Sequence, residues 1–165
     1  ITADNARLVS NLHANLGGLY RMNGHPDLAR EHMEKSISLL DQFNLLHIND
    51  SIPQIANYAM FLTEQQEPER GISELQKLSG IIKEYHSDDC LDYAKVQETL
   101  GTIYLMTANL PQAKTHFKRA FKIYEKIWAD EPEMIEAKYR EIQELYPQIG
   151  FSIGKTLSGL LTKQT

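Results

Sequence analysis

Apolar residues recur every three or four positions along most of this chain, a spacing typical of one face of an α-helix. The stretch LGTIYLMTANLPQAKTHFKRAF, residues 100–121, holds two such patterns in succession. Its small and large apolar residues include Gly101, Tyr104, Ala113, Phe117 and Ala120. Pro111 separates the two patterns, and proline suits the first turn of a helix because its missing N–H would lack a partner there anyway. The pattern predicts an antiparallel pair of helices.

The same arrangement of a turn with proline occurs three times. The turns are Asn23-Gly24-His25-Pro26, Gln66-Glu67-Pro68 and Asn109-Leu110-Pro111. Helical periodicity on both sides of each turn sets the expected ends of the helices. We expect helices at 3–22, 27–43, 52–66, 69–86, 89–108, 112–129 and 132–146, and a last helix near 151–162.

A small residue recurs at a fixed step in the first helix of each pair: Gly17, Ala59 and Gly101 lie 42 residues apart. The second helices keep the same phase, with Ala29, Met33 and Ser36, then Gly71, Leu75 and Leu78, then Ala113, Phe117 and Ala120. A step in the range of about 20–50 residues indicates stacked supersecondary units. We therefore expect repeats at about 3–43, 52–86 and 89–129.

The end of the chain is predicted to close this stack. A fourth step reaches Gln143, between Ile142 and Tyr146, so a degenerate fourth unit is expected at 132–146. Residues 151–162 carry an apolar stripe and are expected to form a capping helix, with an amphipathic membrane anchor as the alternative. The stripe comprises Phe151, Ile153, Leu157, Leu160 and Leu161.

Alternating small and large residues predict how each pair of helices packs. Two helix axes approach to about 8 Å only where the contact residues are small, and large residues one turn away fill the grooves. The residues expected to make these contacts are Gly17, Tyr20, Ala29, Ala59, Gly71, Gly101, Tyr104, Ala113, Phe117 and Ala120.

The composition of the chain restricts the classes of function that it can have. The chain has 165 residues, of which 42% are hydrophobic, so a single domain over 1–165 is expected. No apolar run approaches the roughly 20 residues that span a bilayer. The net charge of −5 argues against direct nucleic-acid binding. One basic cluster comprises Lys114, Lys118, Arg119 and Lys122, with Lys126 beyond it. We interpret it as a solvated helix face, with acidic-peptide or nucleic-acid contact as the alternative.

The first residue and the cysteine content indicate what kind of protein and compartment the chain comes from. The chain begins at Ile1, so we expect a fragment or processed form of a longer protein. Cys90 is the single cysteine, which excludes an internal disulfide and favours a reducing, cytoplasmic compartment.

No set of residues predicts catalysis, a metal site or a cofactor. Gly154-Lys155-Thr156 lacks the earlier glycine of a phosphate-binding loop. The segment His86-Ser87-Asp88-Asp89-Cys90 is expected to cap the next helix through Ser and Asp, and zinc is the weaker alternative. The other histidines show no pairing on adjacent turns: His13, His25, His32, His47 and His116.

The third unit resembles the tetratricopeptide repeat, which has an L-G-x-x-Y motif in its first helix and Ala, a large apolar residue and Ala in its second. Leu100, Gly101 and Tyr104 carry the first motif, and the first unit repeats it at Leu16, Gly17 and Tyr20. The longer step resembles the extended repeats of kinesin light chains and bacterial peptide-sensing regulators. The resemblance covers residues 3 to about 146 and implies an all-α, right-handed solenoid of about three and a half hairpins.

The resemblance also implies a function: a non-enzymatic scaffold that binds a protein or peptide in its concave groove. In the family, an asparagine just before the apolar-small pair often bonds the backbone of a bound peptide. The corresponding groove residues here are Asn11, Asn15, Asn57, Lys95 and Thr99. A complete two-carboxylate clamp is not expected, because Ala14 and Gly18 stand where it would need Lys and Asn. The alternative is a self-association module, a homodimer formed through the first unit or the terminal helix.

Overall fold

The computed structural model describes residues 2–147 and 149, and α-helices account for most of this part of the chain. In chain order they are α1 (Ala3–Met22), α2 (Pro26–Gln42), α3 (Ser51–Glu64), α4 (Pro68–Tyr85), α5 (Leu91–Met106), α6 (Leu110–Ile127) and α7 (Pro132–Leu145). Every end lies within two residues of its predicted position. The described residues form no strand, so the predicted all-α class is confirmed. The predicted capping helix at 151–162 lies outside the described residues.

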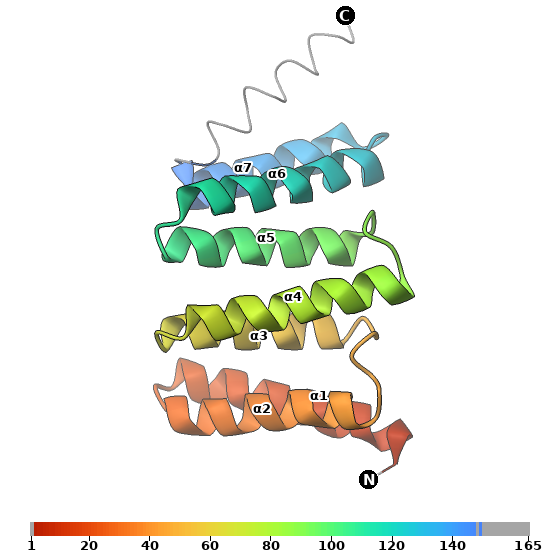
Figure 1. Cartoon of the computed structure of the whole chain (residues 1–165), viewed down its shortest axis with the longest axis vertical. Helices are drawn as coiled ribbons and strands as arrows, with labels where there is room; N and C mark the ends of the chain where they lie inside the picture. The colour runs from red at the N-terminus through yellow and green to blue at the C-terminus, as the bar shows by residue number, and fades with distance from the viewer. Residues whose placement is uncertain (1, 148, 150–165) are drawn as a thin grey trace, which may run out of the picture.

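The helices stack in chain order along the long axis of the molecule, with α1 and α2 at one end and α6 and α7 at the other (Figure 1). The three hairpins α1/α2, α3/α4 and α5/α6 form a helical solenoid, as predicted. Proline opens the second helix of each hairpin within its first two positions. The predicted role of proline is therefore confirmed in all three hairpins.

The three hairpin turns share one backbone geometry. Gly24, Gln66 and Ala108 follow one another at the repeat step and all have positive φ, at 75°, 66° and 58°. In each turn the next N–H donates to a carbonyl five residues earlier, as when the His25 N–H bonds the Tyr20 carbonyl at 2.9 Å. This bond satisfies a helix-end carbonyl that would otherwise lack a partner. In the first turn glycine adopts this left-handed conformation, which it does without steric cost. In the other two turns Gln66 and Ala108 adopt it although each has a side chain.

Small residues lie where paired helices approach most closely. A Cβ on Gly17 would lie 2.6 Å from the Met33 Cγ, and a Cβ on Gly101 would lie 2.9 Å from the Phe117 ring. In the middle hairpin the glycine at the close contact lies on the second helix. A Cβ on Gly71 would lie 2.6 Å from the Ala59 carbonyl oxygen. The close approach is thus kept in all three hairpins by different residues.

The fourth unit departs from the repeat register. Ile142 of α7 is buried, whereas Gln143, reached by the repeat step, is exposed. Lys138 donates to the Glu98 carboxylate at 2.9 Å, and the Tyr124 hydroxyl donates to the same carboxylate at 2.7 Å. Burial raises the pKa of Tyr124, which therefore stays a donor. The contact of Lys138 with Glu98 joins α7 to the third hairpin although the small residue of the motif is absent.

Candidate functional site

Two adjoining hollows of about 480 and 370 Å³ run along the boundary between α1 and α3. They share the lining residues Ala14, Gln54 and Asn57, and together we call them the α1/α3 groove. The remaining lining residues are Asn11, Asn15, Gly18, Arg21, Met22, Met33, Ser36, Asp50, Pro53 and Glu64. The groove therefore lies between the first helices of two consecutive repeats.

A polar network at the floor of the groove joins three helices. The buried Gln54 side-chain oxygen accepts hydrogen bonds from the hydroxyls of Ser10 and Ser36, the first at 2.8 Å. The Gln54 amide nitrogen donates to the Asn11 side-chain oxygen at 2.5 Å. Because buried polar groups are costly when unsatisfied, this network fixes α1, α2 and α3 in one register.

Ion pairs cross the groove at both ends. The Arg7 Nε donates to Asp50 at 2.6 Å, and the Arg21 guanidinium binds Glu64 through two hydrogen bonds, the longer at 2.8 Å. The hydrogen bonds from Arg7 and Asn11 lower the pKa of Asp50. Exposed pairs of this kind add little stability. They span the groove from α1 to Asp50, the residue before α3, and to Glu64 at the end of α3.

The predicted groove residues divide into three groups. Asn15 and Asn57 are exposed along the groove, and their side chains make no hydrogen bond with any described residue. Asn11 lines the same groove, but its amide is engaged by Gln54 and Asp50. Lys95 and Thr99 lie on α5, away from this groove, where Thr99 donates to the Lys95 carbonyl and Lys95 lies 3.9 Å from Asp92. Sequence reasoning missed Gln54 and both crossing ion pairs.

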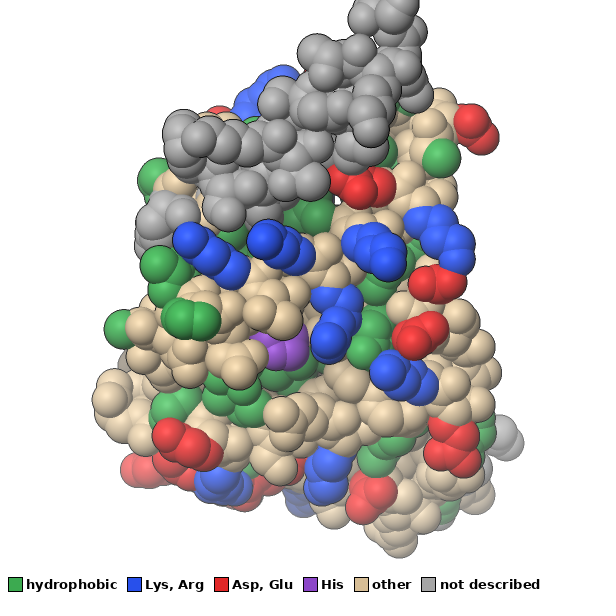
Figure 2. Space-filling model, turned by 45° about the horizontal axis from the view of Figure 1, so that its top comes forward, with side chains coloured by type: hydrophobic (Ala, Val, Ile, Leu, Met, Phe, Trp, Pro, Cys, Tyr) green, Lys and Arg blue, Asp and Glu red, His purple; other side chains and the backbone are tan. Residues whose placement is uncertain are grey.

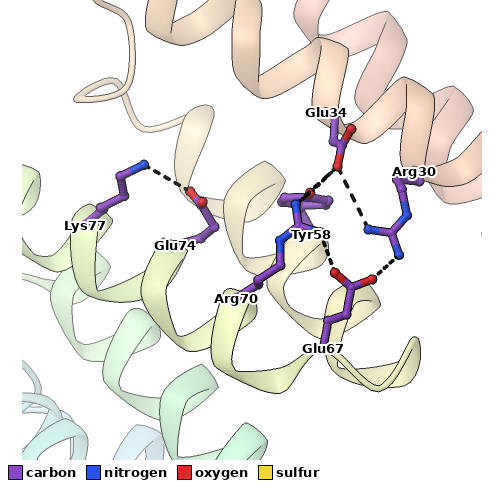
Figure 3. A network of polar contacts seen from close by, with 7 residues as sticks. All are labelled: Arg30, Glu34, Tyr58, Glu67, Arg70, Glu74 and Lys77. Carbon is purple, nitrogen blue, oxygen red and sulfur yellow. Dashed lines mark hydrogen bonds and ion pairs between the residues drawn. The ribbon is translucent and has the colours of Figure 1, made fainter.

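A larger cleft of about 620 Å³ lies between α2 and α4, with α3 as its floor. Figure 3 shows a network of polar contacts that involves four of its charged lining residues: Glu34, Arg70, Glu74 and Lys77. The Tyr58 hydroxyl donates to Glu34 at 2.7 Å, and Arg70 lies between Tyr58 and Glu67. Arg30 of α2 also pairs with Glu67, so the network ties the first repeat to the second. Ser38 and Asp41 also line this cleft, and both are exposed outside the network.

The basic cluster lies on an exposed face of α6. In Figure 2 the Lys and Arg side chains gather on the upper half of the view, where α6 lies. Lys118, Arg119 and Lys122 are exposed there, as expected of a solvated face. Lys126 already pairs with Asp89 of the loop before α5, which lowers the net positive charge of this surface.

Three of the histidines make contacts between the two helices of a hairpin. His13 of α1 and His32 of α2 share a hydrogen bond between their Nδ1 atoms at 2.8 Å, and the Tyr20 ring stacks on His32 at 5.3 Å. The third hairpin repeats this arrangement, because His116 bonds Gln97 at 2.9 Å and stacks on Tyr104 at 5.3 Å. These contacts join facing helices, which the search for pairs on adjacent turns of one helix did not cover.

The His13–His32 pair predicts a pH dependence of stability. Burial, with the nearby His32 and Lys35, lowers the pKa of His13 below its ordinary value of about 6.5. The folded chain then binds fewer protons than the unfolded chain, so the contribution is complete above about pH 6.5 and is lost as pH falls through the lowered pKa. His13→Gln gives the first hairpin the glutamine–histidine pair of the third. Urea unfolding at pH 7.5 and 5.5 should show a smaller loss of unfolding free energy in this variant than in the wild type, and an equal loss would contradict the assignment.

The loop before α5 also differs from expectation. The cap of α5 is Cys90, whose sulfur accepts from the Tyr93 N–H at 3.4 Å, and not the predicted Ser or Asp. The Ser87 hydroxyl accepts from the Asp89 N–H within the loop. Among the described residues, no group of three or more His, Cys, Asp or Glu side chains is arranged to hold a metal ion. None of the described helices has the length and apolarity that a membrane crossing needs.

Stacked hairpins with a close-packing small residue at a fixed step define a helical repeat protein. Residues 51–126 match the family model of the tetratricopeptide repeat. Over these residues the chain is similar to the tetratricopeptide repeat, and the resemblance predicted from the sequence is confirmed. Repeats of this family generally mediate protein–protein interactions and typically act as non-enzymatic scaffolds.

The crystal structure of BtubC (BKLC) from P. vanneervenii has a similar fold. The TM-score is 0.72 at 16% identity, and the comparison covers 95% of this chain and 66% of that chain. The chain thus spans just under two thirds of the length of BtubC. No curated protein matches the sequence significantly.

Proposed function

We propose that the chain is a non-enzymatic scaffold that holds an extended segment of another protein in the α1/α3 groove. One observation carries the proposal: Asn15 and Asn57, one repeat step apart, both line this groove with side-chain amides that bond no described residue. The match to the tetratricopeptide-repeat model supports a protein as the partner. The free amides in the groove support this groove as the place where that partner binds.

The two asparagines offer a means of binding that is largely independent of ligand sequence. A side-chain amide both donates and accepts, so it can pair with a peptide bond whatever side chains the ligand carries. Ala14 and Gly18 leave space between the walls, and the floor network through Gln54 keeps α1 and α3 in position. Met22 at one end can adapt its shape to an apolar ligand side chain.

A displayed library of random twelve-residue peptides provides a probe. Peptides selected on the chain and measured by isothermal titration should lose at least tenfold in affinity for an Asn15→Ala/Asn57→Ala variant. Each neutral hydrogen bond contributes about 0.5–1.5 kcal/mol, so two lost pairs reach that size. Both side chains are exposed, so the variant should fold normally.

The control is Gln76→Ala, which removes an exposed amide from α4 outside the groove. Its affinity for the same peptides should remain within twofold of the wild type. Equal affinity of the wild type and the double asparagine variant would remove the groove from the proposal.

Thr99 and Lys95 belong to the proposal as contacts for a ligand long enough to continue along α5. Self-association remains the alternative, and light scattering across a range of concentrations separates a homodimer from a peptide-binding monomer. Leu157 and Leu160, through which a dimer was expected, lie outside the described residues. A cytoplasmic location also remains a proposal, and it rests on the single cysteine.

A further inference from the structure

The outward face of α1 is a row of exposed leucines. Leu8, Leu12, Leu16 and Leu19 recur at intervals of three or four residues and are at least 40% exposed. Terminal units of solenoids ordinarily carry a polar outer face, since no neighbour covers them. Contiguous exposed apolar surface on a folded protein marks an interaction site. The first unit therefore does not have the surface of a solenoid end.

The repeat step identifies what these leucines correspond to in the other units. In the third unit, two repeat steps further along the chain, Leu100 is equivalent to Leu16 and Ile103 is equivalent to Leu19. Leu16 and Leu19 are 40% and 55% exposed, whereas Leu100 and Ile103 are 2% and 0% exposed. One step along, the same two positions are Tyr58 and Phe61, which are also buried. The positions are apolar in all three units and exposed in the first.

The preceding hairpin buries these positions in the second and third units. Tyr58 and Phe61 belong to one buried cluster with Ala29 and Met33 of α2. Leu100 and Ile103 belong to another, which includes three aliphatic residues of α4: Leu75, Leu78 and Ile82. In both units the second helix of one hairpin covers the first helix of the next. The α1 face is the continuation of this stacking interface.

We propose that the leucine face of α1 is a docking surface for an amphipathic helix that packs on α1 as α4 packs on α5. The partner helix presents aliphatic side chains at intervals of three and four residues, as α4 does with Leu75, Leu78 and Ile82. We choose a helix of this kind as the partner because the α1 face continues the interface that α2 makes with α3 and that α4 makes with α5. The surface is separate from the α1/α3 groove, so each proposal can fail without the other.

The probe is a peptide with the sequence of residues 68–86, which contains α4. A lactam bridge between Lys77 and a Ser73→Glu substitution, both exposed in α4, holds it helical and reduces the cost of folding on binding. The fluorescent peptide is titrated with the chain up to 1 mM and followed by anisotropy. We expect saturable binding that weakens at least tenfold for the Leu16→Asp/Leu19→Asp variant of the chain.

Leu28→Asp provides the matched control, because Leu28 is as exposed as Leu16 but lies on α2. This control should leave the affinity within twofold of the wild type. Far-UV circular dichroism checks that all variants keep their helix content. Three results would overturn the proposal: no saturable binding, equal binding by the Leu16→Asp/Leu19→Asp variant, or a dimer in sedimentation equilibrium that this variant disperses. The last result would assign the surface to a second copy of the chain.

Discussion

Phe117→Ala is expected to lower the free energy of unfolding by about 3–5 kcal/mol, the range for truncation of a buried phenylalanine. The Phe117 side chain is completely buried between α5 and α6 and belongs to the main cluster of core residues. Its ring contacts the position of Gly101 and lies 5.9 Å from the ring of Tyr146, so its loss leaves a cavity at the centre of the third hairpin. Urea unfolding monitored by circular dichroism measures the change.

A second substitution shows whether Phe117 and Gly101 are fitted to each other. Gly101→Ala places a Cβ 2.9 Å from the Phe117 ring and should destabilise the wild type by about 1–3 kcal/mol. In the Phe117→Ala background the ring is absent, and the same change should stabilise the helix by roughly 0.5–1 kcal/mol. A double-mutant cycle reports this change of sign as a coupling energy. Additive effects would contradict the proposed nesting of the two residues.

Gly71→Ala should destabilise the chain by about 1–3 kcal/mol or more. The added Cβ would lie 2.6 Å from the Ala59 carbonyl oxygen, a backbone atom that cannot rotate aside as a side chain can. Relief would require α3 and α4 to separate along their contact. The change in thermal midpoint and in urea unfolding tests the prediction.

Gly80 provides the matched control on the same helix. A Cβ at Gly80 meets no atom within 4 Å, so Gly80→Ala should stabilise α4 by roughly 0.5–1 kcal/mol through its higher helix propensity. The two substitutions are chemically identical and lie within one helix, yet opposite signs are expected. Similar effects would show that the close approach at Gly71 is not required.

The fold could be predicted from the sequence because its determinants are local. Apolar periodicity, a proline at each hairpin turn and a small residue every 42 positions were enough to place the seven described helices. The middle hairpin departs from the motif, although Gly71 was among the residues expected to make helix contacts. Its close contact depends on Gly71 in the second helix, whereas the motif would place the glycine at position 59 of the first.

The groove could be predicted in part. Helical phase placed Asn15 and Asn57 at equivalent positions, and the structure shows both on one groove. Phase within single helices could not show that Gln54 engages Asn11, because that contact joins two repeats. A signal was nevertheless present in the sequence: the pairs Arg7–Asp50, Asn11–Gln54 and Arg21–Glu64 are all separated by 43 residues, one more than the repeat step.

The histidine arrangement was missed for the same reason. His32 and His116 are two repeat steps apart, as are Tyr20 and Tyr104, and each histidine stacks on its tyrosine across a hairpin. Comparing polar residues between repeats, and not only within helices, would have identified both stacks. The middle unit has Leu62 and Glu74 at these positions and lacks the stack.

The position of a bound peptide tests the central claim, binding in the α1/α3 groove, most directly. Amide nitrogen–proton spectra of the chain, recorded during titration with a selected twelve-residue peptide, report this position residue by residue. The account predicts that the largest shifts fall on α1 between residues 11 and 22 and on α3 between residues 53 and 64, with the exposed face of α6 unchanged. Shifts concentrated on α4 and α6, with those two segments unaffected, would contradict it.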